Sequence, residues 1–186
     1  MNDVINAILK RRSVRNYMSI IPPHDEIKMI IDCGLFAPTA RGIQPWFFSV
    51  VKNRDILNEI SAENKQIILN SDDDTAKIML SDNFDNFCGA PMAIIVSADD
   101  TAKYAEADSA NATENMALAA SSLGISSCYI ASFRPAFNGT KSAYFRNVLQ
   151  IPIGYSPRFA LALGYTNAPD TPRKERAENR VVYIEK

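Results

Sequence analysis

The sequence is poor in the residues on which many catalytic and metal sites depend. It contains one histidine, His24, and three widely spaced cysteines, Cys33, Cys88 and Cys128. A histidine-based triad or a histidine-ligated metal would have to be built around His24 alone, and His24 stands where a helix is expected to begin. An odd cysteine count without a CxxC pair argues against a disulfide framework or a zinc knuckle. We expect the cysteines to be small buried hydrophobic residues, and the scarcity of reactive side chains favours chemistry carried by a cofactor.

Neither an excess of one charge nor a long hydrophobic run is present. Lysine and arginine total 20 against 21 aspartate and glutamate, so the net charge of −1 gives no strong field toward nucleic acid or an anionic membrane. No apolar run approaches the roughly 20 residues that span a bilayer. In the N-terminal MNDVINAILKRRS the basic residues follow the apolar ones, opposite to a secretory signal. We expect a soluble cytoplasmic protein that binds neither nucleic acid nor a membrane.

The common nucleotide-binding loops are also missing. No GxGxxG motif follows a predicted strand. Residues 138–143, NGTKSA, resemble a P-loop only superficially, because Thr140 interrupts the required Gly-Lys-Ser/Thr order and the upstream glycine is absent. A phosphate site therefore has to be sought elsewhere in the chain.

Hydrophobic periodicity divides the chain into alternating helices and strands. Helices are expected at residues 3–13, 22–37, 53–69, 76–87, 104–124 and 140–150. Strands are expected at residues 46–51, 91–98, 125–131 and 158–165, with a terminal strand at 180–185. The helix at 104–124 is rich in Ala and Ser nearly all round, so we place it at the centre of the molecule or of a subunit interface. Residues 1–186 are expected to form one domain with helices packed on a sheet of about four or five strands.

Two groups of basic residues lie near opposite ends of the chain. LKRRSVRNY at residues 9–17 contains four cationic side chains, and a second group, Arg173, Lys174 and Arg176, lies in TPRKERAENR at residues 171–180. In extended chain Arg11, Ser13 and Arg15 point to the same side. Two guanidiniums with a hydroxyl between them suit an anion that is gripped through several oxygens. Either group alone is typical of a solvated surface, but both together in a chain of net charge −1 favour an anionic ligand.

A loop of small and polar residues separates a predicted helix from a predicted strand in LFAPTARGIQPWFFSVV, residues 35–51. The helix pattern breaks at Pro38, and Pro45 with the only tryptophan, Trp46, opens the strand. One interpretation is a simple connector. The other is that a ligand lies against this loop.

Four segments of the chain together resemble the nitroreductase family of FMN-dependent oxidoreductases. These segments are RRSVRNY (11–17), APTARGIQPWFFSVV (37–51), NMALAASSLGISSCYI (115–130) and IPIGYSPRFALALGY (151–165) followed by PRKERAENRVVYI (172–184). They occur in the family's order and span nearly the whole chain. The resemblance implies an α+β nitroreductase-like fold with a central, mostly antiparallel sheet flanked by helices. It also implies an intertwined homodimer with FMN bound at the subunit interface.

By position, the resemblance assigns cofactor contacts to three groups of residues. The groups are Arg11, Arg12, Ser13, Arg15, Lys174 and Arg176 at the phosphate and the N1–C2=O edge of the flavin; Pro38, Thr39, Ala40 and Gly42 at the flavin of the partner subunit; and Ile130, Ala131 and Ser132 near N5. Small residues in the second group would let the backbone approach the ring. The sequence departs from the family pattern at Gly42, where many relatives carry asparagine, and at Ala131, where better-known members carry an acidic residue. Asn83 and Asn86 align only loosely with a further flavin contact and are not assigned.

The implied activity needs no catalytic side chain. The flavin would take hydride at N5 from NADH or NADPH and pass it to a small-molecule acceptor such as a nitroaromatic, a quinone or a similar planar compound. Phe133, Phe137 and Tyr144 either line the acceptor pocket or belong to the core. Two alternatives stay open: a flavin enzyme of other chemistry, such as reductive dehalogenation or flavin fragmentation, and a flavin-binding redox sensor or carrier without efficient turnover.

Overall fold

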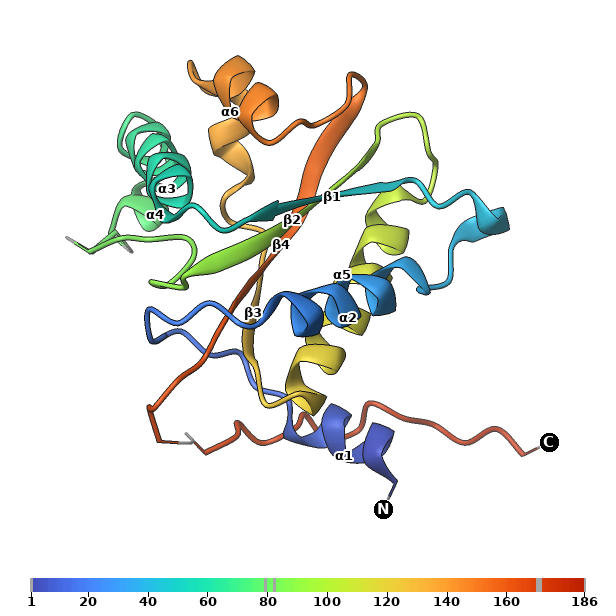
Figure 1. The fold of residues 1–186 in the computed structure, drawn as a ribbon. Coiled ribbons are helices and arrows are strands. Elements are labelled where there is room, and N and C mark those ends of the chain that lie inside the picture. Colours follow the sequence, from blue (N-terminus) through green and yellow to red (C-terminus); the bar gives the residue numbers. More distant parts are fainter. Residues whose placement is uncertain (1, 79, 82, 170–171, 186) are drawn as a thin grey trace.

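The computed structural model describes residues 2–78, 80–81, 83–169 and 172–185. The helices in this part of the chain are α1 (Asp3–Lys10), α2 (His24–Leu35), α3 (Arg54–Leu69), α4 (Asp74–Ile78), α5 (Ala105–Ser122) and α6 (Ser142–Val148), with the short 3₁₀ helices η1 (Ala40–Gly42) and η2 (Arg134–Asn138). The strands are β1 (Trp46–Val51), β2 (Met92–Asp99), β3 (Ser126–Ile130) and β4 (Tyr155–Gly164). Figure 1 shows the sheet between two layers, with α3, α4 and α6 on one side and α2 and α5 on the other.

The sheet has the strand order β1-β2-β4-β3, and each pair of neighbouring strands is antiparallel. The apolar run of β1 pairs along its whole length with β2, from Trp46 opposite Ala98 to Val51 opposite Ala93. Nearly every residue of β2 is buried, which explains why its sequence is continuously hydrophobic rather than alternating. The expected mostly antiparallel sheet flanked by helices is therefore confirmed.

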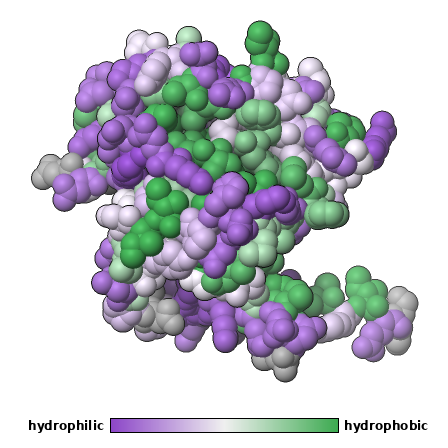
Figure 2. All heavy atoms as spheres, in the orientation of Figure 1, coloured by the Kyte–Doolittle hydropathy of each residue, from purple (hydrophilic) through white to green (hydrophobic). Residues whose placement is uncertain are grey.

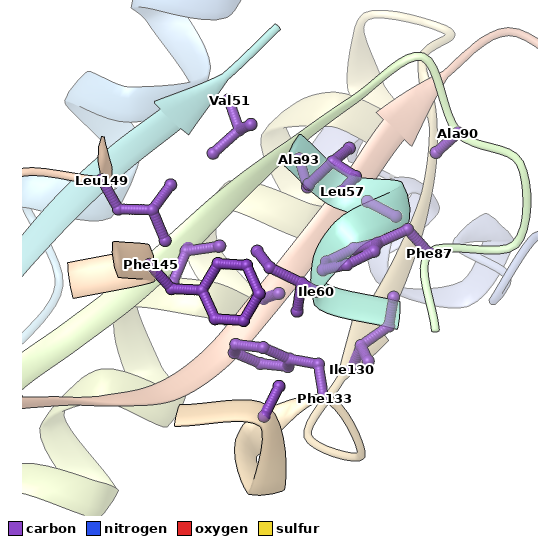
Figure 3. Packing of buried hydrophobic residues seen from close by; sticks show 14 of the residues in the cluster. Val51, Leu57, Ile60, Phe87, Ala90, Ala93, Ile130, Phe133, Phe145 and Leu149 are labelled. Atoms are coloured by element: carbon purple, nitrogen blue, oxygen red, sulfur yellow. The ribbon is translucent and has the colours of Figure 1, made fainter. Parts of the chain in front are cut away.

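The two faces of the sheet carry two separate hydrophobic cores. Ile95 points into the core under α3, η2 and α6, whereas its neighbour Ile94 points into the core under α2 and α5. Figure 3 shows Phe133 among the buried side chains of the first core. Phe133 and Phe137 are buried there, edge to face, while Tyr144 is exposed. For the two phenylalanines the structure thus favours core packing over a role in an acceptor pocket.

Small residues allow α5 to pack at the centre of the second core. Ala112, Ala117 and their small neighbours are buried, and α5 contacts α1, α2 and the sheet. At the crossing of α2 and α5, a Cβ added to Gly34 would lie 2.7 Å from the Met116 side chain. A larger residue at position 34 would therefore force the two helices apart. The predicted central position of this helix is confirmed.

One expected helix, at residues 76–87, is largely replaced by turns. α4 ends at Ile78, and the described residues from 83 to 89 form turns (positions 79 and 82 lie outside the described part). The Asp85 carboxylate accepts hydrogen bonds from the backbone N–H groups of Phe87 and Gly89. Side chains of this type offer the backbone an alternative to helical hydrogen bonds, so local polar residues outweigh the weak apolar periodicity.

The terminal strand expected at residues 180–185 is also not formed. This segment extends past α1 and away from the body of the molecule (Figure 1), and Figure 2 shows hydrophobic side chains along it. Val181, Val182, Tyr183 and Ile184 are 73–85% exposed. The prediction from alternation was wrong for the single chain, because a strand needs a neighbouring edge and this segment pairs with none of the described strands.

No helix in the described part of the chain is long and apolar enough to cross a membrane.

Candidate functional site

The residues that follow α1 are held as an extended segment along β3. The backbone N–H of Val14 donates to the carbonyl oxygen of Ser127 at 2.9 Å, and Ser13 forms a parallel bridge with the same residue. β3 is an edge strand of the sheet, so this segment lies along the outer edge. The basic residues at positions 11–15 are therefore presented from a fixed backbone.

The second basic group lies against the first one. The Arg173 side chain donates from Nη2 to the backbone oxygen of Arg11 at 3.3 Å. The pKa of Arg173 is lowered by desolvation and by the positive charges of Arg12, Arg176 and Arg11. The two basic groups, whose members Arg11 and Arg173 are 162 residues apart in sequence, thus concentrate positive charge at one place. Arg173 and Lys174 are both exposed, and it is Arg173, the neighbour of the assigned Lys174, that contacts Arg11.

Two hollows of about 300 and 350 Å³ border this basic group. Arg12, Val14 and Thr166 line both of them, so the two hollows adjoin. The Arg11 Nε lies 3.4 Å from a carboxylate oxygen of Glu114 on α5. An anion bound here would meet several guanidiniums, which suit bidentate contacts to phosphate oxygens, and would compete with Glu114 for Arg11.

Residues at the end of β3 are held in place by two asparagines. Ile130 is buried, and Ala131 and Ser132 are exposed. Asn64 of α3 donates from Nδ2 to the backbone oxygen of Ser132 at 2.8 Å, and Asn86 donates from Nδ2 to the Ser132 Oγ at 3.0 Å. Asn64 is fully buried and its Oδ1 has no hydrogen-bond partner.

Sequence reasoning missed the role of Asn64, although a signal was present. Leu57, Ile60 and Asn64 stand at positions i, i+3 and i+7, on the face of α3 that packs against the sheet. A polar residue on such a face is buried and needs hydrogen-bond partners. Its position therefore indicated an internal polar contact, which the structure identifies as the chain around Ser132.

Arg15 lies over a cluster that contains two cysteines. Its charge acts on the side chains of Tyr17, Cys88 and Cys128. Burial, together with the two neighbouring thiols, raises the pKa of Tyr17. The cysteines differ in exposure: Cys128 is buried, Cys88 half-buried and Cys33 exposed. The expectation of three buried small residues is therefore wrong for Cys33 and only partly met for Cys88.

The loop between α2 and β1 is anchored at the N-terminal end of α5. The Ala40 N–H donates to the Asp108 carboxylate at 3.1 Å, and Asn111 donates from Nδ2 to the Pro38 carbonyl oxygen at 3.4 Å. Gly42 has φ +67°, a left-handed conformation that glycine adopts without strain. In Figure 1 this light-blue turn lies at the right edge, far from the segment after α1. Within one chain, the predicted site residues thus fall at two separate places.

The chain matches a family model and known structures over nearly its full length. The model described as "Nitroreductase family" matches residues 8–165. A protein of Archaeoglobus fulgidus provisionally named NADH dehydrogenase/NAD(P)H nitroreductase is 31% identical, with 89% of this chain and 86% of that protein covered. FMN reductase (NADPH) of Bacillus subtilis is 25% identical, with 100% and 74% covered. A crystal structure of a nitroreductase with bound FMN from Bacteroides fragilis has a TM-score of 0.92 at 30% identity, covering all of both chains. The chain therefore belongs to the nitroreductase family.

Proposed function

We propose that this chain is an FMN-dependent oxidoreductase that uses NADH or NADPH to reduce a nitroaromatic, a quinone or a similar planar acceptor. The observation that carries the proposal is the meeting of Arg11 and Arg173, which gathers the two basic groups of the chain at one place. Similar proteins include a nitroreductase crystallised with FMN and an FMN reductase that uses NADPH. When bound, FMN supplies the redox chemistry between the nicotinamide and the acceptor.

The basic residues fit the phosphate of FMN. The charges of Arg11, Arg12 and Arg176 depress the pKa of Arg173, and a bound dianion would relieve this mutual repulsion. The Arg guanidiniums supply planar pairs of donors that match phosphate oxygens. We therefore propose that these four residues, rather than Lys174, hold the phosphate group.

Arg15 and the end of β3 fit the flavin ring. Arg15 is exposed on the segment that runs along β3, and a guanidinium near N1 would stabilise the negative charge of a reduced ring. Ala131 and Ser132 are exposed at the end of the same strand. Asn64 donates to the Ser132 backbone oxygen and Asn86 to the Ser132 hydroxyl, which would hold this part of the site in one geometry.

We further propose that the protein is a homodimer whose subunits share each flavin site. Val4 on α1 and Phe36 at the end of α2 are exposed, and both line a mainly apolar groove of about 440 Å³ that α5 completes. Exposed apolar surface of this kind is typical of a protein interface. The turn at residues 38–42 is distant from its own basic segment, so it would contact the flavin held mainly by the partner.

The absorbance spectrum of the purified protein, reconstituted with FMN, tests this function. We expect flavin bands that NADH or NADPH bleaches under anaerobic conditions and that a quinone or nitroaromatic restores. Protein that cannot retain FMN would contradict the proposal. Bound FMN that the nicotinamides reduce only over hours, without acceptor turnover, would instead support the sensor or carrier alternative.

A further inference from the structure

A short chain of hydrogen bonds connects α3 to the end of β3, and it begins at an atom that can only accept. The Ser132 backbone oxygen accepts from Nδ2 of Asn64 at 2.8 Å, and the same Nδ2 donates to Oδ1 of Asn86 at 3.1 Å. Asn86 donates in turn from its own Nδ2 to the Ser132 Oγ at 3.0 Å. Asn64 and Asn86 are buried, so both amides are shielded from solvent.

These contacts leave one orientation for each amide. A carbonyl oxygen cannot donate, so the nitrogen of Asn64 has to face the Ser132 backbone. The oxygen of Asn86 then has to face Asn64, which places the Asn86 nitrogen against the Ser132 hydroxyl. Turning the Asn64 amide over would bring its oxygen against two other oxygens. The present orientation is therefore kept, although Oδ1 of Asn64 has no hydrogen-bond partner in the described part of the chain.

The orientation of Asn86 determines the direction of the Ser132 hydroxyl. An amide nitrogen only donates, so the Ser132 Oγ is the acceptor in this contact and its own hydrogen points elsewhere. Ser132 is exposed, and among the described residues its hydroxyl donates to no acceptor. The backbone oxygens of Ala131 and Ser132 are already occupied, by the N–H of Arg134 at 3.3 Å and by Asn64. The end of β3 therefore presents a hydroxyl that is free to donate.

We propose that Asn64 and Asn86 are positioning residues that hold the Ser132 hydroxyl as a donor toward N5 of FMN. This inference rests on the proposed function, which places the end of β3 against the flavin ring. In the oxidised ring N5 is an acceptor, whereas in the reduced ring it carries a hydrogen and is a donor. A hydroxyl that is held as a donor binds the oxidised ring better than the reduced ring. It therefore shifts the equilibrium toward the oxidised state and lowers the midpoint potential of the bound cofactor.

The midpoint potential of bound FMN tests this inference in four proteins: the wild type, Ser132→Ala, Asn86→Asp and the double variant. In the wild-type background, Ser132→Ala removes the donor, so the binding of oxidised FMN should weaken roughly 3- to 10-fold relative to that of reduced FMN. For a two-electron couple this is a rise in midpoint potential of about 15–30 mV. Ser132→Thr retains the hydroxyl and should restore most of the wild-type potential.

Asn86→Asp is expected to reverse the direction of the hydroxyl. An ionised carboxylate has no hydrogen to donate, so the Ser132 hydroxyl should turn inward to it and away from N5. Within this background, Ser132→Ala should then leave the potential unchanged. The new charge affects both proteins of that pair, so the double-mutant cycle separates the direction of the hydroxyl from the effect of charge. Measurement at mildly alkaline pH keeps the carboxylate ionised.

A second substitution at position 86 covers the case in which Asn86→Asp does not fold. Asn86→Leu removes the donor that directs the hydroxyl, so Ser132→Ala should shift the potential by less than it does in the wild-type background. Ser71→Ala is a matched control, because it removes a hydroxyl that donates to the Ile68 carbonyl oxygen after α3. It should leave the midpoint potential unchanged.

The outcomes separate this inference from the proposed function. Protein that retains FMN but has the same potential with and without the Ser132 hydroxyl would overturn the inference and leave the function intact. An equal rise on Ser132→Ala in the wild-type and position-86 backgrounds would also overturn it, because the hydroxyl would then act without direction from Asn86. Wild-type protein that does not retain FMN would contradict the proposed function, and the inference would fall with it.

Discussion

Arg173 is the residue through which the proposed phosphate site is most directly tested, because it reaches the N-terminal basic segment. Hydrogen bonds to charged groups contribute about 1.5–3 kcal/mol, so Arg173→Ala and Arg11→Ala are each expected to weaken FMN binding roughly 10- to 100-fold. Titration of FMN fluorescence against protein freed of flavin measures this change. Unchanged affinity in both variants would contradict the assignment.

Two further substitutions control for a general effect of charge. Lys77→Ala removes an exposed cation of α4 that pairs with Asp74, and it should leave FMN affinity unchanged. Glu114→Gln removes the carboxylate that pairs with Arg11, and it should tighten FMN binding because Arg11 is then free to meet the phosphate. A loss of FMN affinity in Lys77→Ala as large as that in Arg173→Ala would indicate long-range electrostatics rather than direct contact.

At the scale of elements, Asn64 connects α3 to the end of β3. Asn64→Leu keeps the size of the side chain but leaves the Ser132 carbonyl and the Asn86 Oδ1 without their donor. A buried group left unpaired costs about 1–3 kcal/mol, so the free energy of unfolding should fall by about this amount. Urea denaturation measures it. The exposed Gln66→Leu on the same helix should change stability by less than about 0.5 kcal/mol.

Elements with a strong local pattern could be predicted from sequence, whereas those that depend on distant partners could not. β1 occupies residues 46–51 as predicted, because WFFSVV is a continuous apolar run bounded by polar residues. The helix expected at 76–87 is largely absent, because Asp85 binds nearby backbone N–H groups instead. The strand at 180–185 has the right alternation, yet this segment pairs with none of the described strands.

In the candidate site, too, local patterns could be read from the sequence, whereas contacts between distant residues could not. Runs of basic residues are visible in sequence, but which late cation reaches Arg11 depends on the path of the chain after β4, and in the structure Arg173 makes this contact.

For the whole molecule, the separation of the two groups of predicted site residues is the main consequence of the fold. The turn at 38–42 is anchored to one end of α5, whereas Arg11 pairs with Glu114 further along that helix and lies beside β3. This separation is what led us to propose that each flavin meets both sets of residues because they come from two subunits.

A flavin site shared between two subunits, as proposed, would couple FMN binding to assembly. Phe36→Asp places a charge in the apolar groove at a residue that is 87% exposed, and Ile78→Asp does the same at an 84% exposed residue of α4, away from that groove. We expect Phe36→Asp to shift the protein from dimer to monomer in sedimentation velocity and to weaken FMN binding. Ile78→Asp should change neither property.

Coupling between FMN binding and dimer assembly can also be measured on the wild-type protein. A ligand that binds only the dimer stabilises it by mass action, so dilution of the wild-type protein should weaken apparent FMN affinity, and added FMN should lower the concentration at which the dimer dissociates. Sedimentation at several protein concentrations, with and without FMN, measures both effects. A Phe36→Asp monomer that binds FMN as tightly as the wild type would show that one chain holds the flavin alone. A Phe36→Asp protein that stays dimeric would show that the subunits meet elsewhere.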